Sequence, residues 1–216
     1  MKLYSSQVST NSRRVRVVAA ALGLELELVP IDLASPADRG KLAEVNPNNK
    51  VPVLVDGDFL LWESNAINAY LCAKVPGQTL LPSDPRERAE VDRWSYWIAS
   101  HFAVHIAGLN FERFVKGLMK LGGPNEYAVA YHERLFHQFA KVADDHLAKH
   151  AWLANDRVSV ADYSFASTLM SAQTAQLPLD AYQRISAFVA RIHDRPEWAA
   201  ASNPGQNERS EARGTK

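Results

Sequence analysis

The stretch "NPNNKVPVLVDGDFLLWESNAI", residues 46–67, decides the fold of the first part of this chain. The runs "VPVLV" and "FLLW" are typical of strands, and the turn sequence "DGD" between them favours a tight antiparallel hairpin. The first run opens on Val51-Pro52, although proline cannot donate to a strand ladder. The second runs directly into the polar pair Glu63-Ser64, where a helical pattern begins. Both junctions are candidates for a functional role.

Outward from this stretch, the first third of the chain alternates between element types. The patterns predict strands at residues 2–4 and 24–33 and helices at 12–23, 37–46 and 64–75. With the hairpin, the order is βαβαββα. A β-α-β unit requires a parallel pair with a right-handed crossover, whereas the hairpin is antiparallel. The sequence therefore predicts a small mixed sheet in a domain at residues 1–76.

The pattern changes after this domain. Residues 77–86 are rich in proline, glycine and polar residues, which indicates a linker. From residue 87 to 202 long amphipathic segments follow one another without a convincing strand, so a bundle of helices is expected. The polar tail at residues 203–216 is expected to fray. The predicted fold class is α/β followed by all-α.

Composition excludes several classes of function. The 216 residues are 47% hydrophobic and carry 24 basic and 24 acidic side chains, so the basic surface of a nucleic-acid binder or a membrane-surface protein is not expected. One cysteine, Cys72, excludes an internal disulfide. The start "MKLYSSQVS" does not read as a secretory signal, and no apolar run reaches the ~20 residues that span a bilayer. We expect a cytoplasmic protein whose partners are small molecules or proteins.

The two junctions of the quoted stretch suggest a peptide site. A cis bond is feasible before Pro52, and it would turn the backbone N–H and C=O of Val51 toward an added extended peptide. The helix that begins at Glu63-Ser64 would favour a carboxylate at its N-terminus, while the Glu63 side chain could take an ammonium group. A short peptide with a zwitterionic amino-acid end would satisfy all three features.

The segments "NPNNKVPVL", "WESNAINAYL" and "LANDRVSVADYSF" resemble those of the glutathione transferases, in order and spacing, over roughly residues 1–200. The resemblance implies a thioredoxin-like first domain and a helical second domain. "STNSRRV" looks most like the phi class, which implies that Ser9 is catalytic. It also implies that Pro52 is the cis-proline, that the Val51 backbone pairs with the cysteinyl part of glutathione, and that Glu63 and Ser64 hold its γ-glutamyl end.

The resemblance further implies a function and its partners. The expected reaction conjugates the glutathione thiolate to small hydrophobic electrophiles held against the helical domain. Glutathione is then a cosubstrate, no metal is implied, and a homodimer is expected. The sequence does not name the electrophile, because no motif sets a hydrophobic pocket.

One departure concerns the glycyl carboxylate of glutathione. Phi proteins use a basic His-Lys pair for it, whereas the aligned positions here are Ala37-Asp38. Arg39, Lys41 or Lys50 could substitute, and Lys50 is best placed because it precedes Val51.

Ser9 also has a structural interpretation. It lies in "STNS", whose residues all favour helix N-caps, so it could simply cap the first helix. Thr10 and Asn11 are rivals for the contact with sulfur. Lowering a thiol pKa by about 1 to 2 units needs about 1.4 to 2.7 kcal/mol, and one hydroxyl bound to a charged acceptor contributes about 1.5 to 3 kcal/mol. A single hydroxyl is therefore nearly sufficient.

Two other functions remain open at this point. The fold could serve as a non-catalytic interaction module, as in transferase-like domains of elongation-factor complexes, or as a glutathione-dependent dehalogenase or isomerase.

His101 and His105 have a spacing that zinc sites use, but no third ligand accompanies them, which favours a pocket wall or a solvated face. Aromatic residues of the first long helix are expected first of all in the bundle core, among them Trp94, Phe111 and Phe114. Some of them would face the glutathione site if a hydrophobic second substrate binds between the domains, and the sequence does not say which.

Overall fold

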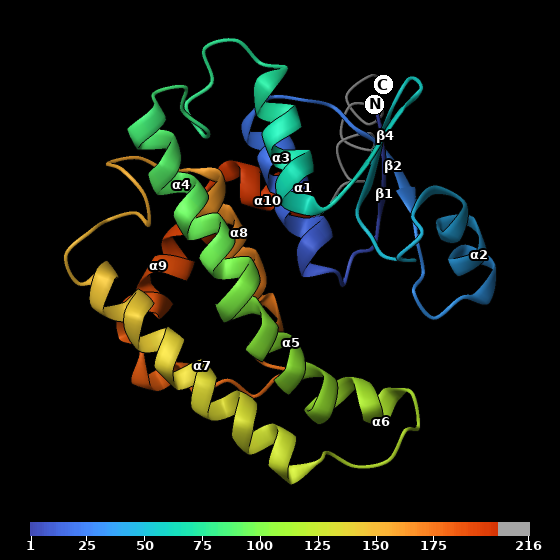
Figure 1. Ribbon diagram of the computed structural model, residues 1–216, viewed down its shortest axis with the longest axis vertical. Helices are drawn as coiled ribbons and strands as arrows, with labels where there is room; N and C mark the ends of the chain where they lie inside the picture. The colour runs from blue at the N-terminus through green and yellow to red at the C-terminus, as the bar shows by residue number, and fades with distance from the viewer. Residues whose placement is uncertain (203–216) are drawn as a thin grey trace, which may run out of the picture. The chain divides into compact units, whose positions relative to one another are not determined.

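The computed structural model describes residues 1–202 of the chain, so the predicted tail at 203–216 lies outside the described residues. The chain divides into two compact units (Figure 1). The first comprises Met1–Gly77 together with residues 193–202, and the second comprises Gln78–Ile192. The domain limits expected from the sequence, at residues 76 and 87, stay a prediction.

The first unit is built on a four-stranded sheet in the order β2-β1-β3-β4. β1 is parallel to β2 and antiparallel to β3, and β3 pairs antiparallel with β4. The βαβαββα order and the mixed sheet are therefore confirmed. The elements are β1 (Lys2–Ser5), α1 (Thr10–Ala21), β2 (Glu27–Pro30), α2 (Pro36–Val45), β3 (Val53–Asp56), β4 (Phe59–Trp62), α3 (Ser64–Ala73) and, far along the chain, α10 (Pro196–Ser202).

Local chemistry explains the hairpin and the sheet edge. Asp56 pairs with Phe59, which leaves a two-residue loop in which Gly57 has φ 63°, a left-handed conformation that glycine adopts without steric cost. β2 is an edge strand, so Pro30 is tolerated there although it has no N–H.

The apolar core of the first unit lies among the sheet, α1 and α3. Its fully buried residues come from all three, for example Leu3 of β1, Val15 of α1, Leu54 of β3 and Ile67 of α3. Packing fixes the two helices against the strands, and with them the loops at which α1 and α3 begin.

The helix α10 packs against α1, far from it in sequence. The Arg13 guanidinium donates from Nη2 to the Trp198 carbonyl at 3.0 Å and stacks over the Trp198 ring at 4.4 Å. Arg16 donates from Nε to the Ala201 carbonyl at 3.2 Å. Only seven residues long, α10 has too little periodicity to be recognised in the sequence as a separate element.

The second unit, Gln78–Ile192, contains helices and no strand, as predicted. A continuous helical segment runs from residue 85 to 118, in green in Figure 1, and is interrupted by two π-helical stretches, Ile98–Phe102 and Phe111–Val115. The α-helices are α4 (Pro85–Trp97), α5 (Ala103–Asn110), α6 (Lys116–Leu118), α7 (Glu126–Leu147), α8 (Val160–Thr168) and α9 (Gln183–His193), whose last residue is grouped with the first unit.

Stacked aromatic rings form much of the core of this unit. Phe102 stacks on Phe165, with 4.8 Å between ring centroids, and on Phe136 at 5.8 Å. The expectation that Phe111 and Phe114 also lie in the core is wrong, because they are 41% and 46% exposed. Both belong to the second π-helical stretch, where the wider turn shifts side chains from the register that an α-helical periodicity predicts.

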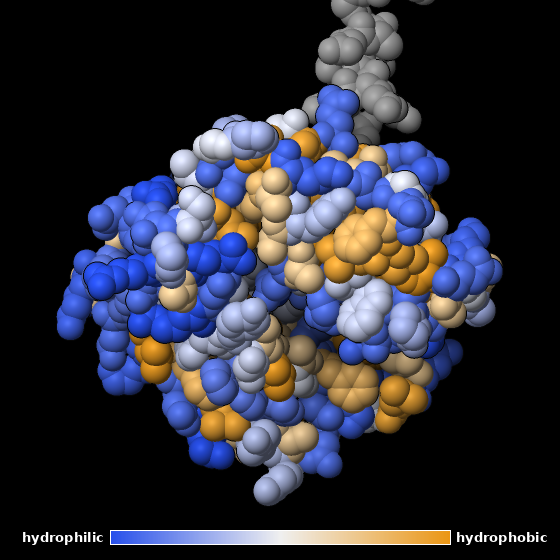
Figure 2. Space-filling model, turned by 45° about the horizontal axis from the view of Figure 1, so that its top comes forward, coloured by the Kyte–Doolittle hydropathy of each residue, from blue (hydrophilic) through white to orange (hydrophobic). Residues whose placement is uncertain are grey.

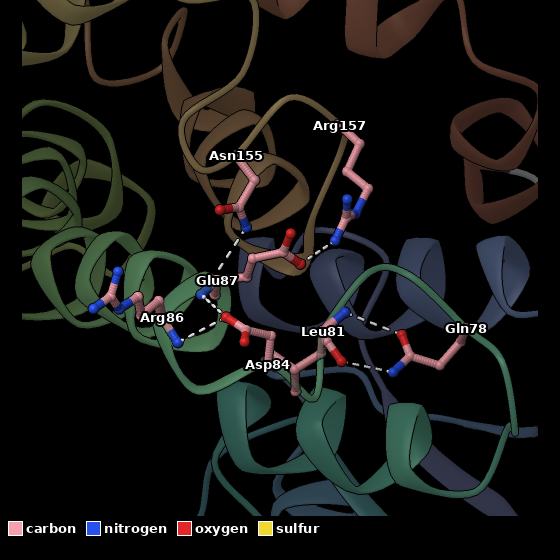
Figure 3. Close-up of polar contacts among 7 residues, drawn as sticks. All are labelled: Gln78, Leu81, Asp84, Arg86, Glu87, Asn155 and Arg157. Carbon is pink, nitrogen blue, oxygen red and sulfur yellow. Dashed lines mark hydrogen bonds and ion pairs between the residues drawn. The ribbon is translucent and has the colours of Figure 1, made fainter.

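Polar contacts fix the start of α4 (Figure 3). Asp84 caps the helix by accepting hydrogen bonds from the backbone N–H groups of Arg86 and Glu87, both at 3.0 Å. Asn155 donates to the Glu87 carbonyl at 3.2 Å, and Arg157 forms an ion pair with the Glu87 carboxylate. The loop that precedes α8 is thereby tied to the first turn of α4.

α8 begins with a capping box. Ser159 and Asp162 exchange side-chain and backbone hydrogen bonds, and Asp162 also accepts the Leu153 N–H at 2.9 Å. Asp162 is fully buried, and desolvation raises its pKa to about 6 in spite of these donors.

Candidate functional site

The segment before β3 leaves a backbone edge without a partner. Val51-Pro52 is a cis peptide bond, as the sequence suggested. β3 begins at Val53, and within residues 1–202 the backbone of Val51 makes no hydrogen bond. Asn46 holds the loop by donating from its side chain to the Lys50 carbonyl at 2.7 Å. An extended ligand could therefore pair with the Val51 N–H and C=O.

The start of α3 offers a second binding feature beside β4. Ser64 is the first residue of the helix and is 6% exposed, whereas the side chain of Glu63 is exposed. Glu63 is the N-cap, and its side chain makes no capping hydrogen bond with the first turn of α3. The junction thus places a helix N-terminus, which attracts anions, beside an exposed carboxylate that can meet a cation.

Ser9 is the N-cap of α1. Its Oγ accepts a hydrogen bond from the Ser12 N–H at 3.2 Å, so the capping interpretation is correct as far as it goes. A capping hydroxyl only accepts, and its own hydrogen remains available to an outside acceptor. Capping and donation to a ligand are therefore compatible. Thr10 is the first residue of α1, and Asn11 is exposed.

Sequence reasoning did not single out Arg14. This α1 residue is 3% exposed, and its Nη1 donates to Asn65 Oδ1, on α3, at 3.4 Å. Burial lowers its pKa to about 10, and the negative charge of Glu63 partly opposes that shift. A signal was present in "SRRVR", three arginines in a helix whose other residues are mostly apolar.

The basic side chains near α2 and β3 that are candidates for the glycyl carboxylate differ in their contacts and exposure. Lys41 forms an ion pair with Asp38 at 3.1 Å. Asp38 accepts the Asp32 N–H, and this bond, followed by the bond from Lys41, holds the pKa of Asp38 below its usual value. Lys50 is exposed next to Val51, so it is the better placed cation for a carboxylate in this region.

Six of the seven histidines lie in the second unit, away from these features in sequence, and His193 is grouped with the first unit. His105 is buried, and its Nδ1 lies 3.0 Å from Nδ1 of His132, while His101 is exposed. His146 and His150 stack at 4.3 Å. Among residues 1–202, no group of three or more histidine, cysteine or acidic side chains is arranged to hold a metal ion. Within the same residues, no helix is long and apolar enough to cross a membrane.

Both parts of the chain match known families. Residues 1–73 match the family described as glutathione S-transferase, N-terminal domain, and residues 113–200 match glutathione S-transferase, C-terminal domain.

Full-length relatives agree with these matches. Glutathione S-transferase 3 of Zea mays is 36% identical over 206 residues, which cover 93% of this chain and 88% of the relative. A probable glutathione S-transferase GSTF2 of Oryza sativa subsp. japonica is 34% identical, with 91% and 93% covered. The solved structure of a glutathione S-transferase-I bound with lactoylglutathione aligns with a TM-score of 0.80 at 27% identity, covering 93% of this chain and 97% of that one. This chain belongs to the glutathione S-transferase family, and its similarity to the plant relatives fits a phi-like member.

Proposed function

We propose that this protein is a glutathione transferase, which joins the thiolate of glutathione to small hydrophobic electrophiles. The observation that carries the proposal is the free backbone edge at Val51, in the same unit as the open N-terminus of α3 at Ser64. A tripeptide with a zwitterionic end matches both features, since an extended backbone pairs with the edge and a carboxylate with the helix start.

Each part of glutathione has a complementary group in this arrangement. The cysteinyl N–H and C=O pair with the Val51 backbone beside Pro52. The γ-glutamyl ammonium group meets the Glu63 carboxylate. The γ-glutamyl carboxylate accepts hydrogen bonds from Ser64 and from the start of α3. The glycyl carboxylate pairs with Lys50, the exposed cation beside Val51. Glutathione is a cosubstrate and is consumed in the reaction.

We assign Ser9 as the residue that contacts the sulfur of glutathione. Its hydroxyl, polarised by the Ser12 N–H that it accepts, donates to the thiolate and stabilises it relative to the thiol. The N-terminus of α1 adds about 0.3 to 1 kcal/mol in the same direction. The thiolate then attacks the electrophilic carbon and a C–S bond forms. In a substitution the leaving group departs with the electron pair of the broken bond, and in an addition the displaced electron pair takes up a proton.

The two alternative functions are less well supported. A non-catalytic module would not need a donor at Ser9 that remains available after capping. A dehalogenase or isomerase would use the same glutathione site with a narrower choice of substrate. Turnover with glutathione and a panel of aryl halides, alkyl halides, enones and isothiocyanates separates these cases: activity on several classes supports the transferase, and activity on one supports the specialised enzyme.

Removal of the Glu63 carboxylate tests the binding site. Glu63→Ala should weaken glutathione binding by about 1.5 to 3 kcal/mol, because one charged partner is lost while the helix N-terminus remains. Isothermal titration calorimetry measures the change. Glu44→Ala, which removes an exposed carboxylate of α2, is the matched control and should leave affinity unchanged. Unchanged affinity in Glu63→Ala, or no binding to the wild type, would refute the site.

We also propose that the protein is a cytoplasmic homodimer. Figure 2 shows hydrophobic patches among the polar residues of one face, and the edge strand β4 exposes Phe59, Leu60 and Trp62 by 38% to 44%. Exposed apolar groups of this kind commonly mark contacts between chains. Sedimentation equilibrium should give about twice the 24.0 kDa mass of one chain. A particle of 24.0 kDa at micromolar concentration would contradict the dimer.

A further inference from the structure

Three arginines of α1 are buried, and they point to different partners. Arg13, Arg14 and Arg16 are only 3% to 5% exposed. Arg13 and Arg16 are three positions apart, so they share one helix face, and both donate to carbonyls of α10. Arg14 is turned away from that face and donates to Asn65, the second residue of α3. Its guanidinium therefore serves a different part of the unit.

The start of α3 needs support from its surroundings. Glu63 has φ 74° and ψ 110°, a conformation that a residue with a side chain rarely adopts and that neighbouring structure must hold in place. Its side chain forms no capping bond, so the side chain does not hold it. The Arg14–Asn65 hydrogen bond crosses from α1 to the first turn of the helix and fixes that turn from the buried side.

Charge links the same residues. Arg14 is buried in an environment that disfavours its charge, and Glu63 is the acidic group that offsets this cost. The attraction is mutual, so the buried guanidinium also biases the exposed Glu63 carboxylate toward the start of α3. A buried cation at this place further favours an anionic ligand group at the helix N-terminus.

We propose that Arg14 is a positioning residue of the ligand site: it holds Asn65 and attracts Glu63, so that Glu63 and Ser64 are preset for the γ-glutamyl end of glutathione. The inference rests on the proposed function, because it names the ligand group that the preset residues meet. Arg14 itself does not touch the ligand; its effect passes through Glu63 and the first turn of α3.

A double-mutant cycle tests this role. Arg14→Met keeps the length of the side chain and removes the guanidinium, and Glu63→Gln removes the carboxylate charge. Arg14→Met should raise the glutathione Kd about tenfold in the wild-type background and about threefold in the Glu63→Gln background, where only the part of the effect that passes through Asn65 and the first turn of α3 remains. In turnover, Arg14→Met should raise the glutathione KM by a similar factor and leave kcat at saturating glutathione within about twofold.

Arg13→Met is the matched control. It removes a guanidinium that is also buried and comes from the same helix, but whose partners lie on α10. It should lower the melting temperature without changing the glutathione Kd. Arg14→Lys, which keeps the charge and loses the planar fork, should bind with a Kd between those of the wild type and Arg14→Met.

The outcomes separate the inference from the function on which it rests. No binding of glutathione to the wild type refutes the proposed function. Binding to the wild type with equal effects of Arg14→Met in both backgrounds, or with an equal loss of affinity in Arg13→Met, refutes the positioning role alone. Should Arg14→Met fail to fold, the same cycle with Arg14→Lys decides: a smaller effect in the Glu63→Gln background supports the role, and an equal effect overturns it.

Discussion

At the scale of the residue, Ser9 combines two roles in one hydroxyl. As an acceptor it caps α1 through the Ser12 N–H, and as a donor it is proposed to stabilise the thiolate. Ser9→Ala should therefore raise the pKa of bound glutathione toward the ordinary thiol value of about 8.5 and slow turnover at neutral pH. The lost rate should partly return as the pH rises. Thiolate absorbance followed against pH measures the shift.

Ser35 provides the control for the capping part of this effect. It caps α2 with nearly the same backbone angles as Ser9, φ −79° and ψ 118° against φ −81° and ψ 119°, and accepts the Asp38 N–H at 3.3 Å. Ser9→Ala and Ser35→Ala should both cost about 0.5 to 2 kcal/mol of stability, but only the first should move the thiolate titration. A shift found instead in Thr10→Ala or Asn11→Ala would transfer the role to that neighbour.

At the scale of the element, a buried capping box holds the first turn of α8. Asp162 accepts hydrogen bonds from the Leu153 N–H, the Ser159 N–H and the Ser159 hydroxyl, all buried. Asp162→Ala leaves these donors without an acceptor, and each costs about 1 to 3 kcal/mol. We expect a total loss of about 3 kcal/mol or more in urea unfolding. Asp162→Asn keeps one acceptor oxygen and should cost less.

Asp84 offers the comparison for Asp162. It also accepts two backbone N–H groups, at the start of α4, but it is exposed, so water can replace it (Figure 3). Asp84→Ala should therefore cost only about 1 kcal/mol. Equal losses in Asp84→Ala and Asp162→Ala would show that burial of the capping box does not matter.

At the scale of the whole molecule, buried histidines should make stability depend on pH. Burial is the largest cause that lowers the pKa of His105, and the charges of His132, His101 and Arg134 lower it further. Because the pKa of His105 is lower in the folded protein, the unfolded chain takes up this proton at a higher pH than the folded protein does. The stability from neutral His105 is thus fully present above the unfolded value of about 6.5 and is lost as the pH falls below it.

His105→Phe should reduce this dependence. The difference in unfolding free energy between pH 7.5 and 5.5 should shrink in the variant by up to about 1.4 kcal/mol. Asp162 acts in the opposite direction, since its raised pKa gives stability that is lost as the pH rises through about 6, but both proteins contain it and it cancels in the comparison. Equal pH dependence in wild type and variant would exclude His105 as a contributor.

Local signals account for what the sequence determined by itself. The two-residue turn at Gly57 fixed the hairpin, and the X-Pro bond before Pro52 marked the cis peptide. The cluster of capping residues around Ser9 marked the start of α1. In each case the physical cause of the structure lies within a few residues of the signal, so the structure can be recognised from the sequence alone. The mixed pairing of the sheet followed because chain connectivity restricts how such units can pair.

Only the tertiary structure decided contacts between residues far apart in the chain. The direction of Arg14 toward Asn65, 51 positions away, and the packing of α10 on α1 depend on how whole elements meet. The exposure of Phe111 and Phe114 likewise follows from a π-helical register that the spacing of apolar residues does not record. A sequence states which side chains a helix carries. Which of them becomes buried, and against what, is set by the packing of the elements around it, because burial is a property of the assembled core.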